Sequence, residues 1–357
     1  MNLRKKSKKL LIHSDPLMKK IIFGFLAIWW MLASCDRAAE KNQARDAGDT
    51  IKSRISQLTE KIREDASNAE LYNTRAQYYI FDKQLDLALR DVNKAISIDS
   101  RKGEYYITLS DTYLVMGQPD NSRDALLRAR ELEPGNTKAL LKLAKLYLIV
   151  KDYKDCYATV NELLTLDHNN AQAHYTRAIG LLEQGDTNRA VGDLLKAADK
   201  NQEFYEAYIE LGELFSIRKD KVAETYLRNA LNLRPDSKEA LYMLGMFYQE
   251  TGQYEKAVSI YTNLARIDTS FRDAPYNIGY IYLVYLKDFK RSIRFFDEAL
   301  KKDPMYYQAY YNRGYAYELS GNYAHAREDY KQALKILVNY DKAVEGLNRL
   351  DKLEIRK

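Results

Sequence analysis

The feature that most constrains this chain is a 34-residue period that runs from residue 69 to residue 340. One column of the aligned copies holds only small residues: Ala76, Ser110, Ala144, Ala178, Gly212, Gly245, Gly279 and Gly314. A second small column follows: Ala88, Ser122, Cys156, Ala190, Ala223, Ala257, Ser292 and Ala326. Copies in phase over this length predict stacked repeats, in which each unit buries its apolar face against the next.

Two further columns indicate how each copy folds. One holds large, mostly aromatic residues: Tyr79, Tyr113, Tyr147, Leu181, Phe215, Tyr248, Tyr282 and Tyr317. The other holds Ala95, Ala129, Leu163, Ala197, Ala230, Leu264, Ala299 and Ala333. Two helices approach closely only where their crossing point carries small side chains, and a large neighbour then fills the gap beside it. Each copy is therefore predicted to be a pair of helices.

The residues expected at the ends of these helices agree with that prediction. Glycines that suit the left-handed end of a first helix recur at Gly117, Gly185, Gly252 and Gly321. Prolines that separate one repeat from the next stand at Pro134, Pro235 and Pro304. The period changes twice, by one residue missing between Gly212 and Ala223 and one extra between Gly279 and Ser292, in or beside the turn between paired helices.

This pattern resembles the tetratricopeptide repeat (TPR) family over residues 69–340. The resemblance implies an all-α, right-handed superhelix (an α-solenoid) of eight helix-turn-helix repeats, which binds proteins in a concave groove lined by the first helices. Apolar stripes predict a capping helix at each end, over residues 50–68 and 341–357. The stripes are Ile51, Ile55, Leu58 and Ile62 at one end and Val344, Leu347, Leu350 and Leu353 at the other.

The first 35 residues have the form of a secretory signal. Lys19 and Lys20 precede a short apolar run, and Leu32-Ala33-Ser34-Cys35 resembles the lipobox of bacterial lipoproteins. That resemblance implies lipidation of Cys35 and a lipid-anchored, extracytoplasmic protein of the bacterial cell envelope, with residues 36–49 as a flexible tether. An uncleaved signal anchor and a cytosolic chain with a chance apolar start are the alternatives. Whether the inner or the outer membrane holds the anchor, and whether Met1 or Met18 is the start, stays open.

Charge and motif content argue against several other functions. Seven of the 56 basic residues and one of the 50 acidic residues lie in the first 35, which leaves 49 of each sign and disfavours nucleic-acid binding. His168, His174 and His325 lack the spacing of metal ligands, and Cys156 occupies a small-residue column, where an inert packed thiol is expected. We find no catalytic or phosphate-binding motif and predict neither enzyme activity nor a cofactor or metal.

Three copies share a charged pair. Arg75, Arg177 and Arg313 precede the first small column, and the same copies carry Asp91, Asp193 and Asp329 three residues after the second. The other five copies have Leu or Ile at the Arg place. The correlation predicts an ion pair between the two helices of a repeat, with a charged ligand site as the alternative.

Positions next to the packed columns are candidates for partner contact. In the last three copies they are Tyr242, Met246, Tyr276, Asn277, Tyr280, Tyr311, Asn312 and Tyr315, and earlier copies offer Thr108, Asp111, Lys138, Lys142, Lys145, Tyr175, Glu210 and Glu213. Tyrosine gives a large, rigid contact area with a hydrogen-bonding tip. We predict a membrane-anchored scaffold that binds a protein partner in envelope assembly or secretion. The alternative is a saccharide-binding outer-membrane lipoprotein, although both Trp29 and Trp30 lie in the leader.

Overall fold

The computed structural model describes residues 37–354, and every element in that range is a helix. The chain divides into two compact units, Met1–Gln202 and Glu203–Lys357. The division falls after the fourth repeat, so each unit contains four repeats. The fold class expected from the sequence is confirmed as an all-helical repeat structure.

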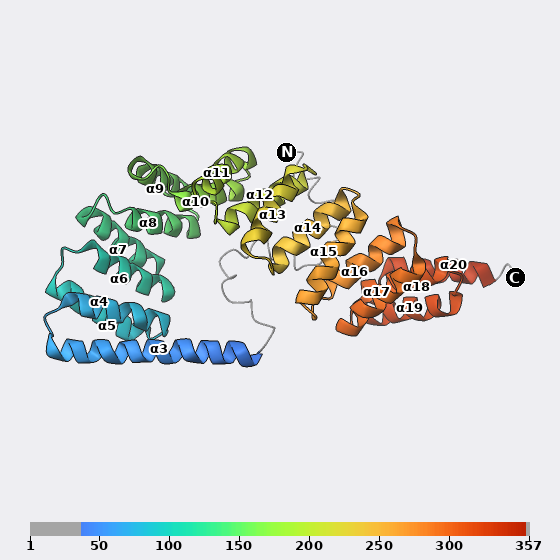
Figure 1. Ribbon diagram of the computed structural model, residues 1–357, viewed down its shortest axis with the longest axis horizontal. Helices are drawn as coiled ribbons and strands as arrows, with labels where there is room; N and C mark the ends of the chain where they lie inside the picture. Colours follow the sequence, from blue (N-terminus) through green and yellow to red (C-terminus); the bar gives the residue numbers. More distant parts are fainter. Residues whose placement is uncertain (1–36, 355–357) are drawn as a thin grey trace. The chain divides into compact units, whose positions relative to one another are not determined.

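Each repeat is one pair of helices (Figure 1). In unit 1, α3 (Arg37–Glu64) precedes α4 (Ala69–Phe81), α5 (Leu85–Ile98), α6 (Gly103–Val115), α7 (Pro119–Leu132), α8 (Thr137–Ile149), α9 (Tyr153–Leu166), α10 (Ala171–Glu183) and α11 (Thr187–Lys200). Unit 2 contains α12 (Tyr205–Ile217), α13 (Val222–Leu233), α14 (Lys238–Glu250), α15 (Tyr254–Ile267), α16 (Asp273–Tyr280), η2 (Ile281–Tyr285), α17 (Phe289–Lys302), α18 (Tyr307–Leu319), α19 (Tyr323–Ile336) and α20 (Asp341–Glu354).

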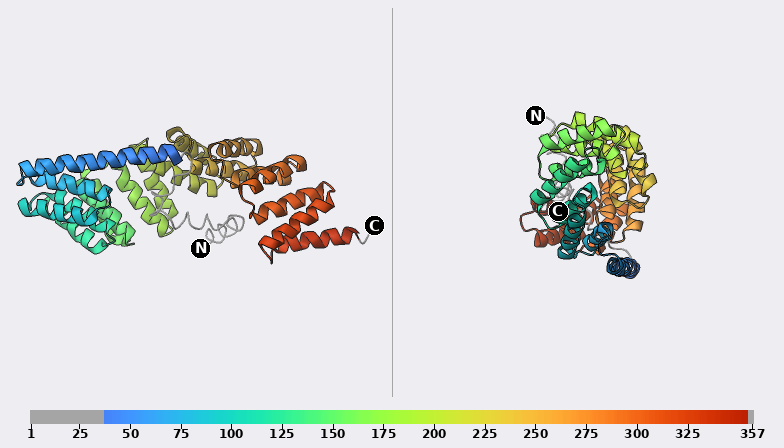
Figure 2. Two further views of the ribbon diagram at one scale, coloured as in Figure 1. Left: turned by 90° about the horizontal axis from the view of Figure 1, so that it is seen from below. Right: turned by 90° about the vertical axis from the view of Figure 1, so that its left-hand side faces the viewer.

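Contacts follow the order of the chain. The two helices of each pair pack against each other, and within each unit the second helix of a pair contacts the first helix of the next pair, as α5 contacts α6 and α15 contacts α16. First helices also meet directly, α4 against α6 in unit 1 and α12 against α14 in unit 2. Figure 2 shows the successive pairs of each unit from two other directions. Such nearest-neighbour packing is the pattern of a repeat protein.

Local chemistry sets the helix ends. One residue with positive φ follows the first helix of every repeat: Lys83, Gly117, Lys151, Gly185, Lys219, Gly252, Lys287 and Gly321. The four glycines are the predicted ones, and lysine takes the left-handed position in the other four repeats, a feature that the glycine pattern alone did not reveal. Asp or Asn side chains cap several second helices; Asp152, for example, accepts a hydrogen bond from the Asp155 amide at 3.1 Å.

The two irregular spacings have different structural forms. The missing residue shortens the second helix of the fifth repeat, since α13 has 12 residues where α11 and α15 have 14. The extra residue lies in the last turn of the first helix of the seventh repeat, where η2 is a π-helix and the Leu286 amide donates to the Ile281 carbonyl at 3.0 Å. A π-turn absorbs one residue without shifting the flanking helices out of phase.

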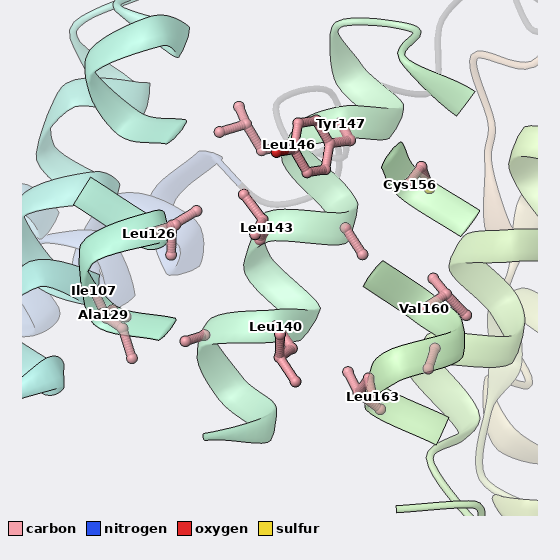
Figure 3. Packing of buried hydrophobic residues seen from close by; sticks show 13 residues of the cluster. Ile107, Leu126, Ala129, Leu140, Leu143, Leu146, Tyr147, Cys156, Val160 and Leu163 are labelled. Atoms are coloured by element: carbon pink, nitrogen blue, oxygen red, sulfur yellow. The ribbon is translucent and has the colours of Figure 1, made fainter. Parts of the chain in front are cut away.

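The small columns form the centre of the packing. The alanines and serines of the second column, with Cys156, are fully buried in the core. In unit 1, Leu140 and Leu143 of α8 lie between Leu126 of α7 and Val160 of α9 (Figure 3). The predicted crossing points of paired helices are thus confirmed.

In unit 2 the first small column is glycine throughout, and in its last three repeats aromatic side chains explain this, whereas Gly212 faces Leu227. A Cβ on Gly245 would lie 2.5 Å from the Tyr261 ring, and one on Gly279 would lie 2.9 Å from the Phe296 ring. The corresponding residues of unit 1 are aliphatic, such as Val92 and Leu194, and there the column holds alanine or serine. The two columns therefore compensate each other in volume.

Both ends of the repeats are covered by a helix, with differences from the prediction. Helix α3 packs on α4 with Ile62 buried, but it begins at Arg37. The expectation of a flexible tether over 36–49 is therefore wrong for residues 37–49, because an Ala- and charge-rich sequence without apolar period can still extend an existing helix. The predicted lipidation residue Cys35, the signal segment and both candidate start methionines lie outside the described residues.

The apolar stripe of α20 also needs correction. Its buried side contains Ala343, Gly346 and Leu350, whereas Val344 and Leu353 are exposed. The ring of Tyr330 is the reason, since a Cβ on Gly346 would lie 2.5 Å from it and the helix turns its smallest residues toward α19. The prediction from the sequence considered only large apolar residues and left out the small ones.

Candidate functional site

The predicted partner-contacting residues of unit 2 lie on its first helices. Tyr242 and Met246 belong to α14, Asn277 and Tyr280 to α16, and Tyr315 to α18. Tyr242, Met246, Tyr276, Tyr280, Tyr311 and Tyr315 are half-buried, and Asn277 and Asn312 are buried. We call this row, with Glu210 and Glu213 of α12 and Glu239 of α14, the first-helix face of unit 2.

Two members of the row connect neighbouring repeats. The Asn312 amide donates a hydrogen bond to Tyr276 Oη at 2.8 Å. The Tyr276 ring stacks on Tyr306 with ring centroids 4.8 Å apart, and Tyr306 in turn donates to Asp273 at 2.8 Å. Burial raises the pKa of Tyr276 far above its usual value, so the hydroxyl is neutral. Tyr276 and Asn312 therefore contribute to the packing between repeats.

At the end of unit 2 the aromatic row continues. Tyr311 stacks on Tyr315 at 6.3 Å and meets Tyr340 edge to face at 5.4 Å. The Arg349 guanidinium of α20 lies 5.5 Å from the Tyr315 ring centroid. Arg349 also binds Glu318 through two hydrogen bonds of 2.8 Å. Helix α20 thus holds the last part of the row in place.

Exposed apolar residues at the ends of the same helices were missed by the sequence reasoning. Ile217 ends α12 and is 55% exposed, Leu319 ends α18 and is 45% exposed, and Val284 lies in η2. All three occupy one repeat column, five residues after Gly212, Gly279 and Gly314 respectively. This column is apolar in six of the eight repeats, since Phe81, Val115 and Ile149 occupy it in unit 1, and that recurrence was the signal that could have identified these residues.

In unit 1 the candidate residues are paired between repeats. Lys138 and Lys142 of α8 form ion pairs of 2.6 Å with Glu104 and Asp111 of α6. Lys145 donates to Gln172 of α10 at 2.5 Å. The lysine cluster predicted in the middle of the chain is therefore a ladder of contacts across adjacent first helices.

The three predicted Arg–Asp ion pairs are present. Arg313 binds both oxygens of Asp329 at 2.6 and 2.8 Å, Arg177 binds Asp193 at 2.7 Å twice, and Arg75 binds Asp91 at 2.6 and 2.8 Å. Bidentate geometry is the strong form of this contact.

Each of these arginines also reaches back to the preceding helix. The partner stands sixteen residues earlier: Thr59 for Arg75, Asn161 for Arg177 and Asp297 for Arg313. Because Thr59 lies in α3, the N-terminal helix occupies the place of a second helix before the first repeat. The arginine therefore joins three helices, where the sequence had indicated two.

The charge state of these pairs follows from their surroundings. Burial raises the pKa of Asp193, but hydrogen bonds from Arg177 and His174 outweigh it and hold this pKa at about 2. At the last repeat, burial raises the pKa of Asp329, although the hydrogen bonds from Arg313 lower it. The pKa of Arg313 is raised, although burial lowers it, because the effect of its two carboxylate partners, Asp329 and Asp297, exceeds the effect of burial. We take this pair as charged at neutral pH because its two hydrogen bonds are short and bidentate.

The other features considered are the thiol of Cys156, a metal site and a membrane-spanning helix. Cys156 is buried, and burial raises its pKa to about 12, as expected for an inert thiol. Within the described part of the chain, no group of three His, Cys, Asp or Glu side chains has the arrangement of a metal site. Among the same residues, no helix has both the length and the apolar character needed to cross a membrane.

Comparison with known families and proteins supports the repeat assignment. Tetratricopeptide repeat family models match residues 69–102, 226–259 and 281–342. The human protein O-mannosyl-transferase TMTC3 is 26% identical over 236 residues, and the bovine BBSome complex member BBS4 is 25% identical over 253 residues. The matches cover 65% and 71% of this chain, but only 26% and 48% of those two proteins.

Two solved structures are similar to this chain at low identity. A tetratricopeptide repeat protein from Parabacteroides merdae is 19% identical, with a TM-score of 0.46 over 70% of this chain and 98% of that one. YrrB, described as a TPR protein with an unusual peptide-binding site, is 19% identical, with a TM-score of 0.40 over 52% of this chain and 95% of that one. The matches to family models and the eight helix pairs in phase identify the chain as a tetratricopeptide repeat protein.

Proposed function

We propose that this chain is a membrane-anchored scaffold whose first-helix face in unit 2 binds a protein partner. TPR proteins act as protein-interaction scaffolds. The observation that carries the proposal is the combination of half-buried tyrosines and exposed apolar residues on successive first helices of unit 2. Rigid aromatic area next to exposed apolar side chains is typical of surfaces that bind proteins.

The anchor and the location belong to the same proposal. The sequence Leu32-Ala33-Ser34-Cys35 supports a lipid on Cys35 and a place in the bacterial cell envelope, in assembly or secretion. A lipid would raise the local concentration of the scaffold at the membrane. Radiolabelled palmitate should be incorporated by the parent and not by Cys35→Ser, and equal incorporation by both would contradict the anchor.

Partner binding is tested by capture from envelope extract with the full chain in detergent. We include Ile217 and Leu319, at the ends of α12 and α18, in the first-helix face. Ile217→Ser and Leu319→Ser remove apolar contact from it, and Val338→Ser is the matched control because Val338 is 75% exposed beyond α19. We expect one protein to be captured by the parent and the control and lost with the two face variants. Equal capture by all four chains would contradict the assignment of this face, and binding to a glycan array without protein capture would favour the saccharide alternative.

A further inference from the structure

Three carboxylates of the first-helix face of unit 2 act on one another, and neither Glu210 nor Glu213 has an ion pair within the described residues. Glu210 and Glu213 stand three residues apart on α12, and Glu239 lies in the first turn of α14, which packs against α12. Glu210 is only 5% exposed, and its Oε1 has no hydrogen-bonding partner within the described part of the chain. A buried carboxylate oxygen without a partner is costly, so it requires an explanation.

The charges around Glu210 make its position less favourable still. Burial, together with the carboxylates of Glu213 and Glu239, raises the pKa of Glu210 to about 8. Burial and Glu239 also raise the pKa of Glu213. Two cations of unit 2 beside Glu239 bind other acids: Arg234 binds Glu206 at 2.9 Å and Lys238 binds Asp268 at 2.7 Å. Burial raises the pKa of Glu239 and outweighs the effect of Arg234, which lowers this pKa.

In four other repeats the equivalent of Glu210 has a partner, whereas Nδ2 of the equivalent Asn277 has none within the described residues. Thr108 and Thr176 hydrogen-bond to carbonyls of their own helices, Asn312 bonds Tyr276, and Lys142 pairs with Asp111. The Lys142–Asp111 contact, at 2.6 Å, shows that this repeat position accommodates a cation beside an acid. At Glu210 the acid is present and the cation is absent from the described residues.

We propose that Glu210, Glu213 and Glu239 receive the cationic side chain, an arginine or a lysine, of a protein partner bound on the first-helix face. The inference rests on the proposed function and adds the chemistry of the partner. A guanidinium or ammonium would donate to the unpartnered Oε1 and would neutralise the mutual repulsion of the three carboxylates. Tyr205, whose hydroxyl lies 3.4 Å from Glu239, adds an aromatic group beside the site.

The test does not need the partner. Nα-acetyl-arginine methylamide is titrated into the full chain in detergent, and methyl NMR follows Met243 and Met246 of α14. The uncharged citrulline analogue is the probe control. We expect a saturable shift with the arginine amide, with a dissociation constant in the millimolar range, and none with citrulline.

Variants decide whether the cluster is responsible. Glu210→Gln should weaken binding of the arginine amide at least tenfold, while Glu255→Gln, an exposed carboxylate on α15, should leave it unchanged. Absence of a saturable shift, an equal response to citrulline, or equal weakening by the two variants would overturn the proposal. Because no partner is present, failure here leaves the capture experiment unaffected, and capture retained by Glu210→Gln would remove the cluster's role without removing the scaffold.

Discussion

At the scale of single residues, the charged side chains of this protein act as connectors. Arg313 joins α18 to α19 through Asp329 and to α17 through Asp297. Most copies that lack the arginine have apolar residues in the same columns, such as Leu244 with Ile260, and one has Leu143 with Thr159. The ion pair is therefore one of two solutions to the same packing problem, since well-packed apolar residues can replace a buried pair.

This view predicts the outcome of a double-mutant cycle. Arg313→Leu strands Asp329, which is buried, and should lower the free energy of unfolding by about 3 kcal/mol. Asp329→Val should lower the free energy of unfolding by less, because Arg313 keeps its ion pair with Asp297. The double variant should be milder than Arg313→Leu alone, as measured by chemical denaturation. Additive losses would show that the two side chains do not act as a pair.

Glu210 predicts a pH dependence of stability. Its pKa is about 8 in the folded chain, against 4.5 for an ordinary Glu, so the unfolded chain loses this proton first. The free energy of unfolding should therefore decline as pH rises from about 4.5 to 8. Glu213 and Glu239 face the same carboxylate and broaden this window.

The Glu210→Gln variant has no carboxyl proton to lose at this position. The stability of this variant relative to the parent should increase across this pH range, by roughly 5 kcal/mol in total, and level off above it. Denaturation at several pH values measures the difference, with Glu255→Gln as control. A difference that does not change with pH would contradict the buried, unpartnered state of Glu210.

At the scale of helices, the two units use different volumes at the same crossing. The last three repeats of unit 2 combine glycine on the first helix with Tyr261, Phe296 or Tyr330 on the second, while unit 1 combines alanine or serine with Val or Leu. The fifth repeat combines Gly212 with Leu227. The π-turn η2 is a second adjustment at this scale, because it accommodates an inserted residue inside a helix.

Volume compensation predicts a rescue. Gly279→Ala should destabilise the chain by about 1–3 kcal/mol, because the new Cβ would lie 2.9 Å from the Phe296 ring. Adding Phe296→Leu reproduces the Ala–Leu combination of the fourth repeat and should recover part of the loss. Thermal unfolding of the single and double variants tests this, and a double variant as unstable as the sum of both changes would refute the compensation.

At the scale of the whole molecule, stability is the sum of contacts between neighbouring helices. The terminal helices α3 and α20 complete this series, and α20 covers Tyr330 while its Arg349 binds Glu318. Each repeat depends on its neighbours, so loss of one end is expected to weaken the nearest repeat first.

A chain that ends at Tyr340 tests this dependence. Removal of α20 exposes Tyr330 and leaves Glu318 without Arg349, so amide hydrogen exchange should accelerate in α18 and α19. Exchange in α4 to α11 should stay as in the parent, and α13 gives an internal reference in unit 2. Uniform acceleration along the chain would show that the molecule unfolds as a single cooperative unit.

The sequence alone determined the repeat, its helix pairs and the Arg–Asp ion pairs, because periodic packing columns and correlated charges are visible in one dimension. Only the tertiary structure showed that these arginines reach a third helix, that lysines replace glycine at left-handed positions, and that α20 turns its small residues inward. Those facts depend on side-chain volumes and contacts between repeats. Glu210 illustrates the difference: in the sequence it is one acid among many, and only burial beside Glu213 and Glu239 distinguishes it.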